Sequence, residues 1–343
     1  MKHINLFDTT LRDGEQAIGF DLNVKQRAYI FNLLNSLHLN TIEFGMSNSG
    51  TEADLTKFID SISLNSVNAQ VCLLSRLVDS DIKIGAKVLN HFKHSRLQLL
   101  GVGSHIHLYK KIRIGEDKLF EIYKRSINLL QDHYNGDITF ILEDASRCDL
   151  GFLFKQIEFL LASGIKGICF ADTVGCMTPS QVKRIFLKIK SKFGHDISLS
   201  CHFHNDIGLA TANTLAAIET GAVEEIQCTS GGIGERCGNS SLEEIIGILQ
   251  LKDEYKSKYQ VDVDLNDALN NLVYMFKFLK KDIYPYKPLI GKYAFTTAAG
   301  IHQDGITKDP ETYSFFDPKL LSRKLEFVVN KLSSTKLLKN IQQ

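Results

Sequence analysis

Short apolar runs alternate with amphipathic segments along about the first 250 residues of the chain. A short apolar run between polar turns is typical of a buried strand, and apolar residues spaced three and four apart are typical of a helix. The pattern predicts strands at residues 4–7, 41–44, 69–74, 96–102, 138–142, 167–171, 197–203 and 225–228. It predicts a helix after each strand, at residues 24–37, 52–62, 79–89, 118–131, 151–162, 179–192, 207–220 and 241–251.

Eight strand–helix units in about 250 residues match the size of a (β/α)₈ barrel. A doubly wound open sheet is the alternative. The count of eight and the absence of a Gly-x-Gly-x-x-Gly pattern after the first strand both favour the barrel. We therefore predict an α/β fold, a (β/α)₈ TIM barrel that forms a catalytic domain over residues 1–255.

The remaining residues, 256–343, differ in character from the barrel pattern. One helix is predicted over 264–280, a loop with Pro285 and Pro288 follows, and the rest is a Lys-rich, weakly patterned tail. This pattern does not predict an independent core. We interpret the region as a C-terminal helical lid or linker extension that covers the barrel or a neighbouring subunit.

Composition and charge narrow the class of protein. Hydrophobic residues make up 44% of the chain and charged residues 23%, which is typical of a soluble globular protein. The net charge of +1 gives no electrostatic reason to expect nucleic acid or an anionic membrane as a partner. Seven cysteines, an odd number without paired spacing, argue against a disulfide framework. With no signal-peptide region and no apolar run of the ~20 residues that a membrane helix needs, we expect a cytoplasmic protein.

Two histidines mark the end of the seventh predicted strand. Side chains alternate between the faces of a strand, so His202 and His204 point the same way. Two imidazoles on one face are a ready pair of metal ligands. The alternative is a pair of core or capping histidines. The position favours the metal site, because active sites of βα barrels are built at the carboxyl ends of the strands.

Polar residues end or follow several of the other predicted strands. They are Asp8, Arg12, Asp13 and Glu15, Glu43, Glu143, Asp172 and Thr173, and Glu235 and Asn239. Because strand ends of a barrel converge, a carboxylate of the first group, the two histidines and Asn239 could form one site for a divalent metal such as Zn²⁺, Mn²⁺, Co²⁺ or Mg²⁺. Such an ion could chelate a 2-oxo acid, and Arg12 could stabilise the alkoxide that forms. Each carboxylate could instead be a solvated loop charge or a salt bridge, an alternative that we favour for Glu15 and Glu235.

Three long segments, 7–16, 202–213 and 232–239, occur here in order and continue into 299–305. Together they closely resemble the 2-isopropylmalate synthase and homocitrate synthase family, a group of metal-dependent TIM barrels, over about residues 4–320. The resemblance implies a Claisen-type condensation, in which acetyl-CoA is enolised and added to the ketone of a 2-oxo acid. Hydrolysis of the thioester then gives a 2-alkylmalate and CoA, so the chain would be an acyltransferase.

The resemblance also implies roles for individual residues. It gives Asp13, His202 and His204 as metal ligands, with Asn239 adjacent or bound through water. It gives Arg12 as the group that polarises the carbonyl, Thr173 as a contact of the oxo-acid carboxylate, and Glu143 as an acid–base residue. It gives His302 and Tyr313 as a pair that the C-terminal segment of a partner subunit delivers over the site, which implies a homodimer with a swapped segment. Glu43, Ser104 and His107, with the neighbouring His105, are further substrate-binding candidates.

Within the family, residues 143–147, 170–175 and 287–291 are most similar to short homocitrate synthases of the nitrogen-fixation type. This implies 2-oxoglutarate as the substrate, with 2-isopropylmalate or citramalate formation as the nearest alternative. Alternatives of other classes are C–C cleavage, as in hydroxymethylglutaryl-CoA lyases, and a non-catalytic homologue. The chain stops soon after the lid, so we expect 256–343 to be a lid and dimerisation segment without a regulatory domain.

Some positions depart from the family pattern. Residues 297–302 keep the second histidine of a usual His-Glu-Ser-Gly-Ile-His run, His302, but not the first. Residues 330–334 replace a usual Gly-Lys-His-Ser-Gly run. These departures bear on the packing of the C-terminal segment. The segment 45–49, where the family reads the oxo-acid side chain, matches no one substrate.

Overall fold

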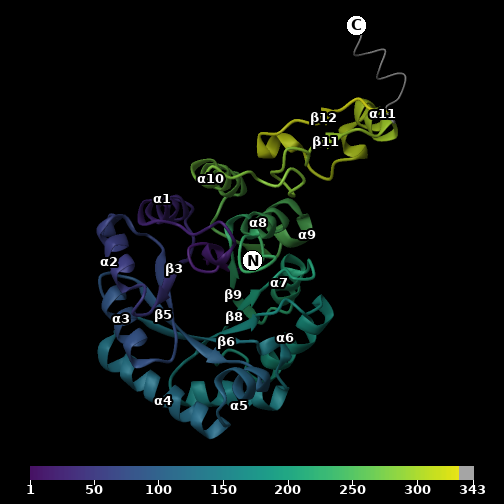
Figure 1. The fold of residues 1–343 in the computed structure, drawn as a ribbon. Coiled ribbons are helices and arrows are strands. Elements are labelled where there is room, and N and C mark those ends of the chain that lie inside the picture. Colours follow the sequence, from purple (N-terminus) through teal and green to yellow (C-terminus); the bar gives the residue numbers. More distant parts are fainter. Residues whose placement is uncertain (332–343) are drawn as a thin grey trace.

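Eight parallel strands close into a barrel with helices around it, as Figure 1 shows. The structure is a computed structural model that describes residues 1–331 of the 343. The barrel strands are β2 (Asn5–Asp8), β3 (Thr41–Ser47), β4 (Gln70–Ser75), β5 (Ser95–Val102), β6 (Asp137–Glu143), β7 (Gly167–Asp172), β8 (Ser198–Phe203) and β9 (Val223–Cys228). Each strand pairs with its sequence neighbour, and β9 returns to pair with β2. The predicted TIM barrel is confirmed.

A helix follows each barrel strand. These helices are α1 (Val24–Asn35), α2 (Glu52–Asp60), α3 (Asp79–Leu89), α4 (Glu116–His133), α5 (Leu150–Ala162), α6 (Pro179–Phe193), α7 (Ala210–Glu219) and α8 (Leu242–Leu251). Local chemistry fixes several of their starts. Asn23 and Gln26 form a capping box on α1, and Asp149 accepts from the backbone N–H of Phe152 at the start of α5. Among residues 1–331, no helix is both long and apolar enough to cross a membrane.

The helix expected at 207–220 begins three residues later than the apolar spacing predicts. Asn205 accepts a hydrogen bond from the backbone N–H of Ala210 with its side-chain oxygen, at 3.1 Å. Gly208, in between, has a φ of 75°, which a helix does not allow. The chain therefore makes a turn at the end of β8 before α7 starts, and this turn keeps the residues after His204 at the rim of the barrel.

The barrel interior contains two different layers of side chains. Toward one end, Arg96 of β5 pairs with Glu225 of β9 at 2.7 Å. A separate apolar cluster joins side chains from β3 to β7, namely Met46, Leu74, Leu100, Ile141, Cys169 and Ala171. Leu100 lies four residues after Arg96 on β5, so both side chains face the barrel interior. Ile141 lies two residues before Glu143 and Ala171 two before Thr173, so the cluster lies beneath these residues on the same face of the strands.

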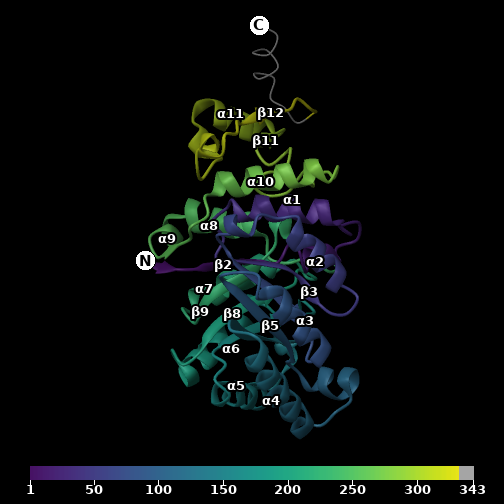
Figure 2. The same ribbon diagram turned by 90° about the vertical axis from the view of Figure 1, so that its left-hand side faces the viewer.

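The chain after α8 first packs against the barrel and then extends away from it. α9 (Asp253–Lys256) leads to β10 (Tyr259–Gln260), which pairs with β1 (Lys2–His3) at the N-terminus. α10 (Leu265–Phe278) packs on α1 and α8, close to the predicted 264–280. Past α10, β11 (Thr296–Thr297) pairs with β12 (Glu326–Phe327) around α11 (Gly300–Lys308). Both views show this C-terminal extension, residues 296–327, on the far side of α10 from the barrel strands (Figures 1 and 2), and Asn266 of α10 donates a hydrogen bond to the carbonyl of Leu320.

One ionic cluster ties the start of this region to the barrel. Lys287 contacts Glu243 at 3.0 Å and Glu244 at 2.9 Å, both in the first turn of α8. Glu243 is almost fully buried, and Lys287 shows only 14% of its side chain. A buried charge is stable only when it is paired. Lys287 therefore fixes the point from which the C-terminal extension departs.

Candidate active site

Asp13, His202 and His204 meet at the carboxyl end of the barrel. Asp13 follows β2 in a turn whose backbone N–H groups converge on the carbonyl of Thr9, and the histidines close β8. One donor atom from each of the three residues lies within 4.8 Å of the others, and all three residues are buried. Residues about 190 positions apart in the sequence thus form one cluster, as the convergence of barrel strands predicts.

The donor atoms of this cluster suit a divalent cation. His202 Nε2 lies 3.2 Å from His204 Nε2, and Asp13 Oδ2 lies 3.4 Å and 3.8 Å from these two nitrogens. Burial, and then the neighbouring His202, lower the pKa of His204 to about 4, so its ring is neutral at pH 7. Burial alone would raise the pKa of Asp13, but Arg12 and the histidines outweigh it and hold that pKa well below its usual range. Neutral imidazole beside an ionised carboxylate is a typical ligand set for a divalent metal.

Asn239, from the loop between β9 and α8, supports the cluster from one side. Its Nδ2 donates to Asp13 Oδ1 at 3.0 Å and to the carbonyl of Ile233 at 3.3 Å. The backbone N–H of Glu235 donates to the same Asp13 oxygen at 3.2 Å. The Oδ1 atom of Asn239 is buried and has no hydrogen-bond partner within residues 1–331. The amide therefore positions Asp13 and leaves an oxygen available to a ligand.

Arg12 joins the cluster to β3. Its Nε donates to Glu43 Oε2 at 2.7 Å and its Nη1 donates to Asp13 Oδ2 at 2.6 Å. Burial raises the pKa of Glu43, although Arg12 opposes this shift. Arg12 Nη2 is buried without a partner in the described part of the chain, and so is Glu43 Oε1. A buried guanidinium nitrogen without a partner suits an oxygen of a bound substrate.

Glu143 ends β6 and shows 22% of its side chain at the barrel mouth. Lys111 Nζ lies 2.8 Å and 2.5 Å from its two carboxylate oxygens, and His107 Nδ1 lies 3.2 Å from Oε2. Both partners belong to the turn His107–Ile112 after β5. Glu143 and His107, which sequence reasoning named separately, are therefore direct neighbours.

The other candidates around Glu143 stabilise the loops. Ser104 is fully buried and donates to Asp144 at 2.5 Å, and Thr173 Oγ1 accepts from the backbone N–H of Asp144 at 2.8 Å. His105 lies between the rings of Tyr109 and Phe152, and its two nitrogens contact Glu116 and Asp149. The ring of His105 is thus occupied by protein partners rather than turned to a substrate carboxylate.

His302 belongs to α11 and Tyr313 follows the turn Pro310–Thr312, so both lie in the C-terminal extension, which Figure 2 shows on the far side of α10 from the barrel strands. Their rings stack on each other, with centroids 4.1 Å apart. The structure therefore pairs these two residues with each other but does not bring them to Arg12 or Asp13. The departures from the family pattern at 332–334 lie outside the described residues.

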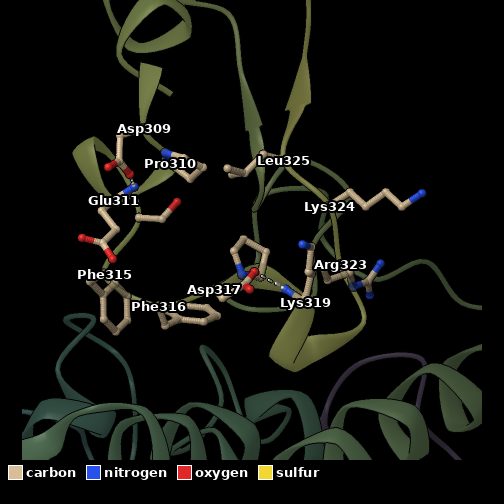
Figure 3. A pocket seen from close by; sticks show the side chains of 12 residues that line it. Asp309, Pro310, Glu311, Phe315, Phe316, Asp317, Lys319, Arg323, Lys324 and Leu325 are labelled. Carbon is tan, nitrogen blue, oxygen red and sulfur yellow. Dashed lines mark hydrogen bonds between the residues drawn. The ribbon is translucent and has the colours of Figure 1, made fainter. Parts of the chain in front are cut away.

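A hollow of about 640 Å³ lies within the same extension (Figure 3). Asp309 and Glu311 line one side of it, and Arg323 and Lys324 line the other, with Phe315 near the base. None of the predicted site residues lines this hollow. It is a feature of the extension, separate from the metal-compatible cluster.

Sequence reasoning missed two residues that contact the site. Lys111, bonded to Glu143, stands in a run of exposed basic residues that reads as an ordinary loop. Gln227 contacts His202 from the neighbouring strand β9. The pairing of β8 with β9 and the alternation of side chains could have indicated Gln227, because His202 and Gln227 are direct partners in the strand register.

Comparison with known proteins places the chain in a family. The family model "HMGL-like" matches residues 3–273, and "Homocitrate synthase post-HMGL domain-like" matches residues 289–342. A 2-isopropylmalate synthase of Campylobacter jejuni is 34% identical over 93% of this chain, and one of Geobacillus stearothermophilus is 36% identical over 94%. The chain spans 62% of the length of each of these relatives.

Solved structures with the same fold are more distant in sequence. The HMG-CoA lyase of Brucella melitensis has a TM-score of 0.68 at 16% identity, covering 82% of this chain and 100% of its own. The hydroxymethylglutaryl-CoA lyase of Pseudomonas aeruginosa has a TM-score of 0.65 at 16% identity, covering 82% of this chain and 95% of its own. At such identities, the likeness supports the barrel and nothing finer.

Proposed function

This chain belongs to the HMGL-like family, and we propose that it condenses acetyl-CoA with a 2-oxo acid to a 2-alkylmalate and free CoA. The observation that carries the proposal is the buried cluster of Asp13, His202 and His204 beside Arg12, whose Nη2 has no partner within the described residues. A divalent metal held by these three ligands would supply the Lewis acid that polarises the ketone. The similarity to 2-isopropylmalate synthases supports the condensation reaction.

Different residues of the chain have different roles in this reaction. The free Nη2 of Arg12 is the donor for the ketone oxygen as it gains negative charge, and the ion pair with Glu43 holds the guanidinium in place. A base takes one proton from the methyl group of acetyl-CoA, the new carbon–carbon bond forms at the ketone carbon, and the ketone oxygen takes up a proton to become the hydroxyl of the product. Water then cleaves the thioester, which releases CoA and a carboxylate. Glu143, at the mouth, and His302, from the extension, are the acid–base residues of this scheme.

The barrel interior supports a 2-oxo acid with an apolar side chain. Met46, Leu74, Leu100 and Ile141 form the apolar cluster beneath Glu143. The second carboxylate of 2-oxoglutarate would lose its hydration there without a partner, which is costly. The relatives named 2-isopropylmalate synthase also favour this alternative over homocitrate. We therefore propose 2-oxoisovalerate as the substrate and 2-isopropylmalate as the product.

A second copy of the chain is the proposed partner. His302 and Tyr313 stand apart from the cluster of their own chain, on an extension that exposes 79% of Ile301 and 67% of Phe315. Exposed apolar side chains of this size favour a protein contact. A homodimer in which each extension covers the other barrel would bring His302 to a site and bury these residues.

The test of the proposed function is release of free CoA from acetyl-CoA with 2-oxoisovalerate, before and after removal of metal with a chelator. We expect release that depends on added Mn²⁺ or Zn²⁺. Arg12→Gln should abolish release. The matched control is Arg184→Gln, which removes an exposed arginine on α6 and should retain the wild-type rate. A folded, metal-loaded protein that releases no CoA would contradict the proposal.

A further inference from the structure

Gln227, in β9, lies beside His202 in the barrel interior and is only 1% exposed. Its Oε1 is 3.0 Å from Nδ1 of His202. On the other side of the same amide, Nε2 donates to Oε1 of Gln98 in β5, at 3.3 Å. Gln98 is equally buried, with 1% exposed. The three side chains form a chain of hydrogen bonds across the barrel, and it ends at the metal-compatible cluster.

The position of His202 decides which of its nitrogens must carry a proton. A neutral imidazole has one protonated and one unprotonated nitrogen. Nε2 faces His204 and Asp13 at 3.2 Å and 3.4 Å, so Nε2 is the atom that would bind a metal through its lone pair. The proton must then be on Nδ1. Nδ1–H needs an acceptor, and the amide oxygen of Gln227 lies within hydrogen-bond distance.

Gln98 is the second hydrogen-bond partner of the Gln227 amide. If the amide were turned over, its NH₂ group would face His202 Nδ1 and would favour a proton on Nε2, the form that does not bind metal. The structure has the amide the other way, with Nε2 of Gln227 donating to Oε1 of Gln98. With the hydrogen bonds in this direction, Nδ1 of His202 carries the proton and Nε2 keeps its lone pair for a metal ion.

We propose that Gln227 is a positioning residue for the metal site, which holds His202 as the Nδ1–H tautomer and aims Nε2 at the ion. Groups that bind the second nitrogen of a metal-ligating histidine typically contribute 10–100-fold to metal affinity. The inference rests on the metal-dependent function proposed above. The tests measure the metal affinity of the protein and the tautomer of His202, and neither measurement needs catalytic turnover.

The first test measures Zn²⁺ affinity of the full chain by competition with a chromogenic chelator. Gln227→Met removes the acceptor at similar volume and should weaken Zn²⁺ binding about 10–100-fold. Gln227→Glu keeps an acceptor and should bind Zn²⁺ at least as tightly as the wild type. The matched control is Gln156→Met, which loses a buried bond to Tyr123 far from the site and should leave the affinity unchanged. Wild-type affinity in Gln227→Met would overturn the proposal.

The second test needs no change at Gln227, so it stands even if Gln227→Met fails to fold. Long-range ¹H–¹⁵N spectra of the Zn²⁺-loaded wild type, labelled at histidine nitrogens, distinguish the two tautomers, and the signal lost in His202→Gln assigns the residue. We expect His202 with its proton on Nδ1. A proton on Nε2 would overturn the proposal. Failure of CoA release alongside these expected results would count against the proposed reaction and not against the role of Gln227.

Discussion

The Nε2 atoms of His202 and His204 lie 3.2 Å apart, and both residues are buried. Two protonated nitrogens would repel each other at this distance, so at least one of the two atoms presents a lone pair to the other. Without a cation, the two buried nitrogens lose their hydration and gain at most one hydrogen bond with each other. With a cation, both nitrogens and Asp13 become ligands, and this is the reason to interpret the cluster as a metal centre.

The first prediction concerns the loss of His204, one of these proposed ligands. His204→Ala should lose most of the bound metal, because a single imidazole and a carboxylate remain to bind it. Metal content of the purified variant, measured by atomic emission, checks this. His195→Ala, an exposed histidine before β8, is the control and should bind metal like the wild type. Full metal content in His204→Ala would show that the ligand set is wrong.

The second prediction separates the metal centre from the acid–base residues. His302→Ala should keep the metal, since His302 lies on the extension, but should lose roughly 10²-fold or more in turnover, the usual scale for a positioned acid–base group. Metal content and the rate of CoA release are measured on the same preparation. Near-normal turnover would remove His302 from the mechanism.

The third prediction concerns the swapped extension. If His302 acts on the partner's barrel, coexpressing His302→Ala with Arg12→Gln gives mixed dimers with one intact site each. Random pairing then restores about a quarter of wild-type activity, because half of the dimers are mixed and one of their two sites is complete. Coexpression of Arg12→Gln with His204→Ala is the control and should stay inactive, because neither barrel is intact. An inactive first mixture would contradict the swap.

The fourth prediction concerns stability and pH. Asp8 is fully buried beneath the loop after β2, where burial raises the pKa of its carboxyl to about 7 despite hydrogen bonds from Thr10. The folded state therefore holds a proton that the unfolded chain releases near pH 4. Stability from this group is present at low pH and declines as the pH rises toward 7, by about 1.4 kcal/mol per pH unit at most.

Asp8→Asn keeps the hydrogen-bonding shape but removes the ionisation. Between pH 5 and pH 7 the free energy of unfolding, from denaturant titrations, should fall more steeply in the wild type than in Asp8→Asn. The difference between the two proteins isolates Asp8 from other groups that titrate in this range, such as Glu15, whose pKa burial raises to about 7. Equal slopes would mean that Asp8 is not held protonated.

The sequence predicts the barrel well because each strand and helix has a local cause. Apolar runs, amphipathic spacing and caps such as Asn23 act over a few residues. The start of α7 was wrong because one side chain, Asn205, and one glycine conformation at Gly208 outweighed the apolar spacing. Convergence of the strand ends also predicted that a carboxylate after the first strand meets His202 and His204, and the family resemblance indicated Asp13 as that carboxylate.

The contacts around the cluster depend on longer-range geometry. The bond between Gln98 and Gln227 joins residues 129 positions apart across the barrel interior. Lys111 reaches Glu143 because the loop after β5 folds back over the end of β6. Neither pair has a sequence motif of its own. In the proposed homodimer, His302 would act on the barrel of a second chain, a contact that local sequence patterns do not describe.

The most direct test of the central claim is a comparison of 2-oxo acids. CoA release from acetyl-CoA is measured with the metal-loaded protein and 2-oxoisovalerate, 2-oxoglutarate, pyruvate or oxaloacetate at equal concentration, and the product is identified by mass. A condensation enzyme whose substrate lies beside the apolar cluster of the barrel interior should give the highest kcat/KM with 2-oxoisovalerate and yield 2-isopropylmalate. A clear preference for 2-oxoglutarate would contradict the proposed apolar substrate. No release with any of the four acids would contradict the proposed reaction.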